Sequence, residues 1–353
     1  MKKELIINKL PTDFCHASTL AAVGGVQGIE TLACWFGGSH EGADDVGIYL
    51  SACRQGQWSE PELVVSTQEP CWNPVLYLHG AEAAGQRVSL FYKQGRAIAD
   101  WRTYVLTYVL TLTLKQGEVL RSEPHELVDG DVSGGRGPVR NKLLRLRNGR
   151  LLAGGSVERG IWTAFADISD DDGRTWQKST TIAIDGLTYN AGEKTAESAI
   201  EVSQQSFFGR GVIQPSLWQS ADGSVHMLLR SSEGYVYRSD SQDNGASWCA
   251  AYPTQIPNNN SGLDLVQDAA GRLFLVCNPV EANWGRRSPL SLFVSQDDGA
   301  SWQRVLDLES GEGEYSYPAI ICHDNRLEIS YTYNRQNIAH VICYINELDL
   351  FIK

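Results

Sequence analysis

One eight-residue pattern occurs three times in this chain, at residues 169–176, 241–248 and 295–302. Each copy reads Ser-x-Asp-x-Gly-x-Ser/Thr-Trp, follows a short apolar run and precedes another. This context predicts a hairpin turn, because Asp can accept hydrogen bonds from the turn backbone, Gly can adopt a positive φ and Trp can fix the turn to the next strand. Three copies with five shared positions indicate a repeated β-unit.

The spacing of the copies predicts the size of this unit. Their terminal tryptophans lie 72 and 54 residues apart, and a weaker copy without the Asp occurs at residues 51–58. A unit of roughly 55–60 residues is typical of one four-stranded propeller blade with a long loop. The sequence therefore predicts an all-β chain, a single six-bladed β-propeller domain over residues 1–353, with the three turns on its outer rim. The alternative is a β-sandwich with coincidental Asp-Gly turns.

Two further expectations concern segments outside the repeated turns. A strand at residues 5–8 or at 341–350 should complete the last blade, so that no long sheet edge stays exposed. Residues 184–210 account for most of the longer interval and contain the most helix-compatible run of the chain. We expect a loop or short helix there that overhangs the pocket or meets a partner subunit.

Composition limits the kinds of partner and compartment. A formal net charge of −12 argues against a general nucleic-acid or membrane-surface partner. No apolar run has the length of a signal peptide or a membrane span. The eight cysteines lack C-x-x-C or zinc spacing, and most lie within apolar runs, so we expect buried free thiols in a cytoplasmic protein without a metal or other cofactor.

Several predicted strands are interrupted by polar or charged side chains that are costly to bury. Inner strands and loops of a propeller line a central pocket at one end, so these side chains are the candidate site residues. A solvated turn is the alternative for any one of them, but their recurrence about once per blade favours a site. The candidates are His16, Glu41, Asp45, Asn73, Arg136, Arg140, Asn141, Lys142, Glu158, Gln214, Arg230, Asn260, Arg287, Tyr315 and Tyr317.

The three turns resemble the Asp-box of sialidase-like β-propellers. In exo-sialidases of the bacterial and animal type, three arginines hold the substrate carboxylate. A Tyr activated by a Glu attacks the anomeric carbon, and an Asp on a first-blade loop protonates the leaving oxygen. Tyr suits this role because the anomeric carbon bears a carboxylate, which would repel an anionic nucleophile; sialidases are an exception among glycosidases in this respect.

The C-terminal half carries most of this resemblance. The segment from Gln214 to Arg230 resembles the family segment with the Glu and the second Arg, and Arg287 resembles the third Arg. By the same resemblance Tyr315 is the expected nucleophile. The expected general acid is on the first-blade loop, at Asp45 or Glu41.

Two positions depart from the family pattern. His16 stands where the first Arg is expected, and Gln214 stands where the activating Glu is expected. An amide is not a useful base near pH 7, so Tyr315 would need another route of activation, through Glu158, through His16 or through the field of nearby cations.

These residues support three functional hypotheses. The first is an exo-acting, sialidase-like glycoside hydrolase on an acidic mono- or oligosaccharide, whose carboxylate is held by Arg230 and Arg287 with help from Arg136, Arg140 or Lys142. The second is a uronate-directed lyase or an atypical glycosidase on the same scaffold, in which a His16 base and a Tyr315 acid would suit β-elimination. The third is a non-catalytic carbohydrate-binding propeller.

Overall fold

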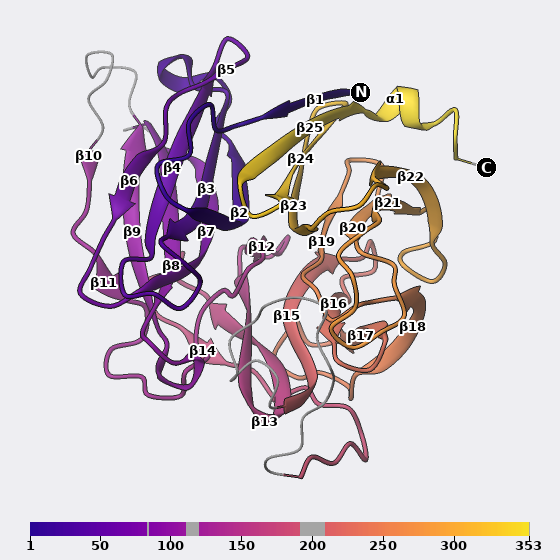
Figure 1. Cartoon of the computed structure of the whole chain (residues 1–353). Helices are drawn as coiled ribbons and strands as arrows, with labels where there is room; N and C mark the ends of the chain where they lie inside the picture. Colours follow the sequence, from indigo (N-terminus) through magenta and orange to yellow (C-terminus); the bar gives the residue numbers. More distant parts are fainter. Residues whose placement is uncertain (83–84, 111–119, 191–208, 353) are drawn as a thin grey trace.

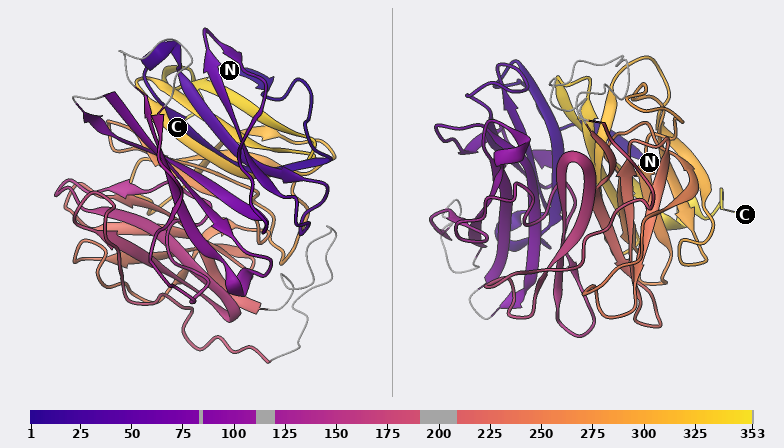
Figure 2. Two further views of the ribbon diagram at one scale, coloured as in Figure 1. Left: turned by 90° about the vertical axis from the view of Figure 1, so that its left-hand side faces the viewer. Right: turned by 90° about the horizontal axis from the view of Figure 1, so that it is seen from below.

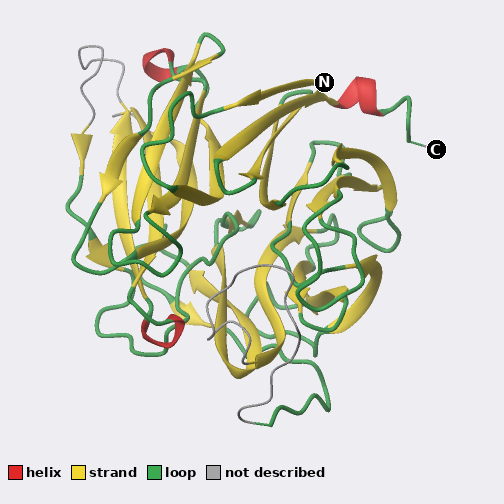
Figure 3. Ribbon diagram, viewed as in Figure 1, coloured by secondary structure: helices red, strands yellow, loops and turns green. Residues whose placement is uncertain are grey.

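The computed structural model describes residues 1–82, 85–110, 120–190 and 209–352. Regular structure in these residues is almost entirely β-strand, as expected (Figure 3). Its short helices are the 3-10 helices η1 (Val26–Gly28) and η2 (Ile98–Asp100) and the α-helix α1 (Ile345–Leu348). In this part of the chain no helix is long and apolar enough to cross a membrane. Most of the segment expected to overhang the pocket, residues 191–208, lies outside the described residues.

The strands form five sheets, which follow one another along the chain. The first contains β2 (Phe14–Ala22), β3 (Thr31–Gly38), β4 (Gly47–Arg54), β5 (Gln57–Trp58) and β6 (Glu62–Val65). The second contains β7 (Cys71–Glu82), β8 (Gly85–Gln94), β9 (Arg102–Leu110), β10 (Leu120–Arg121) and β11 (His125–Glu126). The third contains β12 (Leu144–Arg145), β13 (Leu151–Ser169), β14 (Gln177–Lys178), β15 (Gly209–Gln219), β16 (Val225–Ser231), β17 (Tyr235–Ser241) and β18 (Tyr252–Pro257). The fourth contains β19 (Asp264–Gln267), β20 (Leu273–Cys277), β21 (Leu290–Ser295) and β22 (Gln303–Glu309). The fifth contains β1 (Lys2–Leu5), β23 (Tyr315–His323), β24 (Arg326–Tyr333) and β25 (Asn337–Tyr344).

The third sheet is larger than the others because a short parallel contact joins two antiparallel groups. Residues 160–162 of β13 pair with residues 209–211 of β15 in parallel, whereas the pairing of β15 with β16 and of β16 with β17 is antiparallel. Without this contact the sheet would separate into β12–β14 and β15–β18. The strands thus fall into five sheets but six antiparallel groups.

Apolar clusters fill the space between each group and the next, where burial of apolar surface holds them together. Successive clusters join β2–β4 to β7–β9, β7–β9 to β13, β13 to β15–β17, β15–β17 to β19–β21, β20–β22 to β23–β25, and β25 to β2–β3. The first group therefore packs against the last. In Figure 1 the groups surround a common centre, with β2, β7, β15, β19 and β23 toward the middle.

The N-terminal strand belongs to the C-terminal sheet. β1 pairs antiparallel with β25, from Lys2 opposite Ile342 to Leu5 opposite Ala339. Figure 2 shows the indigo N-terminal and yellow C-terminal strands side by side. The expected strand at residues 5–8 is therefore present but lies earlier, at Lys2–Leu5, while residues 345–348 form α1 instead of continuing the strand.

The three repeated turns share one hydrogen-bonding arrangement. In the second copy the hydroxyl of Ser241 donates to Asp243 over 2.8 Å, and Asp243 also accepts the backbone N–H and the hydroxyl of Ser247, at 2.8 and 2.5 Å. The corresponding bonds form at Asp171 and Asp297. The Asp therefore closes each turn from within, as its place in the pattern predicts.

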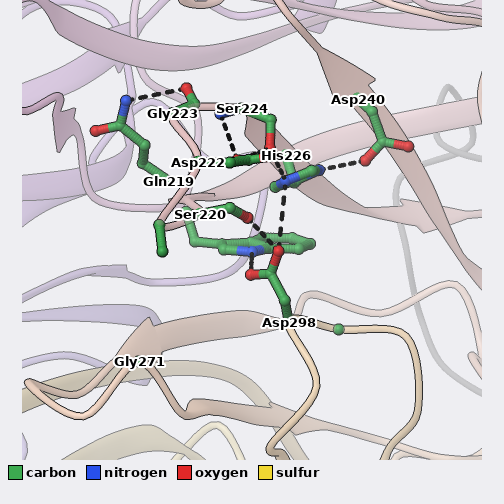
Figure 4. A network of polar contacts seen from close by, with 12 residues as sticks. Gln219, Ser220, Asp222, Gly223, Ser224, His226, Asp240, Gly271 and Asp298 are labelled. Atoms are coloured by element: carbon green, nitrogen blue, oxygen red, sulfur yellow. Dashed lines mark hydrogen bonds and ion pairs between the residues drawn. The ribbon is translucent and has the colours of Figure 1, made fainter.

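The residue after this Asp ties the turn to the neighbouring sheet. Asp298 accepts hydrogen bonds from the indole of Trp218, over 2.9 Å, and from the hydroxyl of Ser220, both at the β15 end of the third sheet. His226 lies between Asp298 and Asp240, as Figure 4 shows. The third turn therefore joins the fourth sheet to the third through partly buried polar contacts.

All eight cysteines are free thiols, and six of them are buried, in agreement with the expected buried thiols. Burial raises the pKa of the Cys53 and Cys71 thiols to about 11, so these groups are neutral, apolar core side chains at ordinary pH.

Candidate active site

A cavity of about 320 Å³ opens where the inner strands converge. Its wall takes side chains from β2, β3, β7, β13, β15, β16 and β23 and from the segments between strands. The lining residues are His16, Phe36, Glu41, Gly42, Trp72, Asn73, Arg96, Ile98, Trp101, Glu158, Gln214, Arg230, Trp284, Arg287, Tyr317 and Arg335.

A β-bulge in each of four inner strands shapes the cavity wall. The pairing register shifts after His16 in β2, Trp72 in β7, Ile213 in β15 and Ser316 in β23. At these shifts Ala17, Asn73, Gln214 and Tyr317 have positive φ angles of 54°, 47°, 55° and 53°. A bulge re-aims side chains, which is why bulges are frequent next to active sites.

Three of these residues precede a proline. Asn73, Gln214 and Tyr317 are followed by Pro74, Pro215 and Pro318. Proline has no N–H group to contribute to the sheet, so it is accommodated at a bulge where the ladder is already interrupted. All three side chains before a proline line the cavity.

Tyr317 and Arg230 form the centre of the site. The guanidinium of Arg230 donates to the phenol oxygen of Tyr317 over 2.7 Å and to the side-chain oxygens of Asn260 and Gln214 over 2.7 and 3.2 Å. Arg230 is 3% exposed, and these three partners are all neutral. A buried cation normally has an anionic partner, so this arrangement favours an anion as the ligand.

Two further arginines flank the same space. Arg287 donates to Glu314 over 2.6 Å, and Arg335 donates to Glu314 over 2.9 Å and also pairs with Glu41. Burial alone would raise the pKa of Glu314, but the positive charges of Arg287 and Arg335 hold it below its usual range. Glu314 therefore orients both guanidiniums, although it does not itself line the cavity.

His16 is a neutral side chain on this wall. Burial, and then the positive charges of Arg335, Arg287, Arg140 and Arg230, lower its pKa well below the usual range for imidazole. Its ring lies 4.4 Å from the ring of Tyr317, measured between centroids, and 5.6 Å from that of Phe36. His16 therefore cannot replace an arginine as a cation, although it can accept or donate a hydrogen bond.

Glu158 is the acid of the cavity that forms no ion pair with another described residue. Its burial raises its pKa, against the opposing influence of Arg230 and Lys93. Glu41, in contrast, pairs with Arg335. A carboxyl group with a raised pKa can be protonated when it meets a substrate, which is the state that a general acid requires.

An aromatic wall completes the cavity. Trp72 and Trp101 stack with their ring centroids 6.2 Å apart, and Phe36 meets Trp72 edge-on at 5.4 Å. Flat apolar faces beside polar groups suit a sugar ring, which has both kinds of surface. In the described part of the chain no group of His, Cys, Asp and Glu side chains is arranged to hold a metal ion.

Comparison with known proteins assigns the chain to a family. Residues 30–329 match the family described as the BNR repeat-like domain. The chain belongs to that family. No curated protein matches it by sequence.

The BNR repeat-like protein also has many structural relatives. A Dyadobacter fermentans protein of unknown function is 15% identical with a TM-score of 0.71, and the match covers 96% of this chain and 97% of the other. A Trypanosoma rangeli sialidase, in complex with the inhibitor DANA, is 13% identical with a TM-score of 0.70, over 96% and 56% of the two chains. The Hadza microbial sialidase Hz136 is 12% identical with a TM-score of 0.69, over 95% and 66%. This chain thus spans little more than half of the T. rangeli sialidase. At identities this low, the structural similarity shows a sialidase-like fold.

Many of the residues expected in the site of this BNR repeat-like protein do converge. Those that line the cavity are His16, Glu41, Asn73, Glu158, Gln214, Arg230, Arg287 and Tyr317. Asn260 is outside the cavity lining, and its side-chain oxygen accepts a hydrogen bond from Arg230. The first-sheet position that resembles the family's first Arg is therefore occupied by neutral His16, while Arg335, from the turn after β24, supplies a third guanidinium.

Two expected catalytic residues do not reach the cavity. Tyr315 is 5% exposed, its hydroxyl donates to the carbonyl oxygen of Glu312 over 2.9 Å, and its ring contacts Tyr333. Asp45 instead accepts hydrogen bonds from the backbone and hydroxyl of Ser39, in a separate surface hollow. The expectation that both lie in the pocket is corrected: Tyr317 is its tyrosine, and Glu41 and Glu158 are its acids.

The other expected basic residues have partners outside the cavity lining. Arg136 pairs with Asp167 over 2.7 Å, and Lys142 pairs with Asp264 over 2.8 Å. Arg140 is buried and donates to the carbonyl oxygens of Ser18 and Pro318, below the ring of Tyr317, and Asn141 donates to backbone carbonyls of β15. These residues support the inner strands, and none of them lines the cavity.

Sequence reasoning missed Arg335, Arg96 and the aromatic wall. Arg335 lies in a tight turn, and nothing in its sequence neighbourhood distinguishes it from a solvated arginine. The role of Tyr317 did have a signal, because it shares with Asn73 and Gln214 the place before a proline at the start of an inner strand.

Proposed function

We propose that the six antiparallel groups are the blades of a six-bladed β-propeller forming one domain over residues 1–353. The cyclic order of the apolar clusters, from β2–β4 round to β25 and back to β2–β3, supports this. On this proposal the short parallel contact between β13 and β15 joins two blades at their edges instead of making them one sheet.

We propose that the protein is an exo-acting glycoside hydrolase on an acidic sugar. The observation that carries this is Arg230, a buried guanidinium whose hydrogen-bond partners among the described residues are neutral, one of them the phenol of Tyr317. The substrate carboxylate would bind between Arg230, Arg287 and Arg335 and provide the missing negative charge. The sialidases of similar fold, one of them in complex with sialic acid, favour this substrate class.

The chemistry follows from the same side chains. Tyr317 would attack the anomeric carbon, and the guanidiniums of Arg140, Arg230 and Arg287, each within 6 Å of its ring, would stabilise negative charge developing on the phenol oxygen. Glu158 would protonate the leaving oxygen, with Glu41 as the second acid of the cavity. The proposed substrate is an acidic mono- or oligosaccharide. The protein is proposed to be cytoplasmic and to need no cofactor.

The test is hydrolysis of a panel of sialosides and uronides by the purified protein, measured as released free sugar. We expect release from at least one acidic glycoside and none from its neutral counterpart. Release from neutral glycosides at an equal rate, or from none of the panel, would contradict this function.

The neutral imidazole of His16 against Tyr317 favours a second candidate, a uronate-directed lyase. There His16 would remove the proton next to the carboxylate, and Tyr317 would protonate the leaving oxygen. Elimination leaves an unsaturated product with ultraviolet absorbance, whereas hydrolysis does not, so one absorbance trace on acidic oligosaccharides separates the two.

A further inference from the structure

His16 and Tyr317 form a contact pair at the centre of the cavity. Their ring centroids are 4.4 Å apart and their ring planes are inclined by 55°. The two residues lie at bulges of β2 and β23, strands that pack side by side. His16 is 2% exposed, and its Nδ1 atom is buried with no hydrogen-bond partner in the described part of the chain.

We propose that His16 is the base that accepts the phenolic proton of Tyr317, and that it does so when a substrate carboxylate occupies the surrounding arginines. This rests on the proposed hydrolase function and adds the step that Gln214 cannot perform. His16 would then be a catalytic residue instead of a weakened part of the carboxylate clamp.

The charges around His16 explain why the substrate would control this step. In the free protein, burial and four guanidiniums keep the pKa of His16 well below its usual range. A carboxylate bound among the arginines offsets their charge, and an opposite charge at close range favours the protonated imidazole by about 1–3 pKa units. The cations that act on His16 are Arg140, Arg230, Arg287 and Arg335, and the other charged or titratable groups that line its cavity are Glu41, Arg96, Glu158 and Tyr317.

The other polar groups of the cavity are less suited to this proton. The amide of Gln214 has no basic atom near neutral pH. Glu41 is paired with Arg335. Glu158 is the acid assigned to the leaving group, and a nucleophile and a leaving group lie on opposite sides of the anomeric carbon. Among the described side chains of the cavity, His16 combines a contact with the ring of Tyr317 and a nitrogen that can accept a proton.

The step balances with these residues alone. The phenol oxygen of Tyr317 forms a bond to the anomeric carbon as its proton moves to His16. The glycosidic C–O bond breaks, its electron pair stays on the leaving oxygen, and that oxygen takes the proton of Glu158. Water then attacks the anomeric carbon and gives a proton to the Glu158 carboxylate, while Tyr317 leaves and recovers its proton from His16.

In this arrangement, acidic and neutral sugars would be distinguished by their rates of turnover. A neutral sugar of the same shape leaves the arginine charges in place, so His16 stays a poor base and Tyr317 is not activated. We therefore expect a neutral analogue to bind in the cavity without turnover.

The first test is a rescue. His16→Asn should lower kcat about 100-fold or more, the usual effect of removing a general base, with KM changed only a few-fold. Adding Gln214→Glu to this variant should raise kcat again by at least 10-fold. Gln214 and Tyr317 accept hydrogen bonds from the same guanidinium nitrogen of Arg230, so a carboxylate at position 214 would lie beside the phenol. Tyr317→Phe should not be rescued, and Tyr315→Phe is the matched control.

The outcomes separate the two proposals. A wild-type protein inert on every acidic glycoside contradicts the hydrolase function and this step with it. An active wild type whose His16→Asn variant keeps its kcat, or loses it without recovery in the folded double variant, overturns the role of His16 alone.

The second test keeps the wild-type chain and so does not depend on how the variants fold. The ring signal of His16 is titrated by NMR, alone and with free N-acetylneuraminic or glucuronic acid. We expect the midpoint to move upward by about one pH unit or more on binding. An unchanged midpoint with either acid bound, or no binding of either acid, overturns the proposal.

Discussion

Tyr315 and Tyr317 stand two residues apart on β23, yet one is part of the core and the other lines the cavity. In a regular strand, residues i and i+2 face the same side. The register shift between Ser316 and Ala319, with the φ of 53° at Tyr317, interrupts that alternation. The pair is therefore a built-in comparison between a structural and a candidate catalytic phenol.

Tyr317→Phe should abolish turnover while leaving acidic-sugar binding largely intact, because the ring stays and only the reactive oxygen is lost. Tyr315→Phe should keep full activity and lower the free energy of unfolding by about 1 kcal/mol, through loss of its hydrogen bond to Glu312. Steady-state kinetics and denaturant unfolding of both variants check this. Loss of activity in the Tyr315 variant alone would reverse the assignment.

The same pair shows how far the sequence could lead. The repeated turns and the segment from Gln214 to Arg230 depend on local spacing, so an all-β fold and two of the arginines were predictable. The choice between Tyr315 and Tyr317 depends on a bulge, which redirects side chains without changing the local pattern of residue types. Arg335 depends on how the turn after β24 meets the first sheet, a long-range relationship with no local signal.

Arg230→Lys should weaken binding of an acidic sugar more than Arg304→Lys, a surface control. Arg230 uses one guanidinium to hold Asn260, Gln214 and Tyr317, and a lysine ammonium cannot reproduce this planar geometry. Arg304 is an exposed residue that pairs with Asp307, outside the cavity lining. Arg287→Lys should behave like the Arg230 variant. Calorimetric titration with free acidic sugars measures the difference, and equal affinities in all three variants would contradict a carboxylate clamp.

Asp243→Ala should destabilise the protein without altering catalysis. The substitution removes the bonds from Ser241 and Ser247 that close the second repeated turn, a loss of about 1 kcal/mol or more. None of these residues lines the cavity, so kcat and KM should stay at wild-type values. A fall in activity at an unchanged melting temperature would show that the turn affects the site.

Acid should weaken the contacts that Asp240 of β17 makes with β16 and β18 inside the third sheet. Burial alone would raise the pKa of Asp240, but hydrogen bonds from His226, Tyr252 and Arg238 lower it below its usual range. Since the folded-state pKa is depressed, the stabilisation is present above the unfolded-state pKa of about 3.9 and is lost as pH falls toward the folded value.

Asp240→Asn tests this dependence, because an amide keeps the shape of the side chain but does not titrate. We expect the variant to be less stable than the wild type at neutral pH and the difference to narrow on acidification below about pH 4. Urea unfolding at a series of pH values measures this. A difference that stays constant with pH would show that the charge of Asp240 does not contribute.

Gln214→Glu tests whether the cavity can hydrolyse sialosides once a carboxylate stands at position 214. Residue 214 already lies at the nitrogen of Arg230 that also binds Tyr317, with donor–acceptor distances of 3.2 and 2.7 Å. A carboxylate there could accept the phenolic proton directly, so if the cavity is a sialidase with one part replaced, the variant should gain or increase sialidase activity on a fluorogenic sialoside. Gln214→Asn, a shorter amide without a basic atom, is the control for altered packing. If the Glu variant stays inert on sialosides while the wild type hydrolyses another acidic sugar, the resemblance to sialidases describes ancestry, and the His16–Tyr317 pair serves a different acidic substrate.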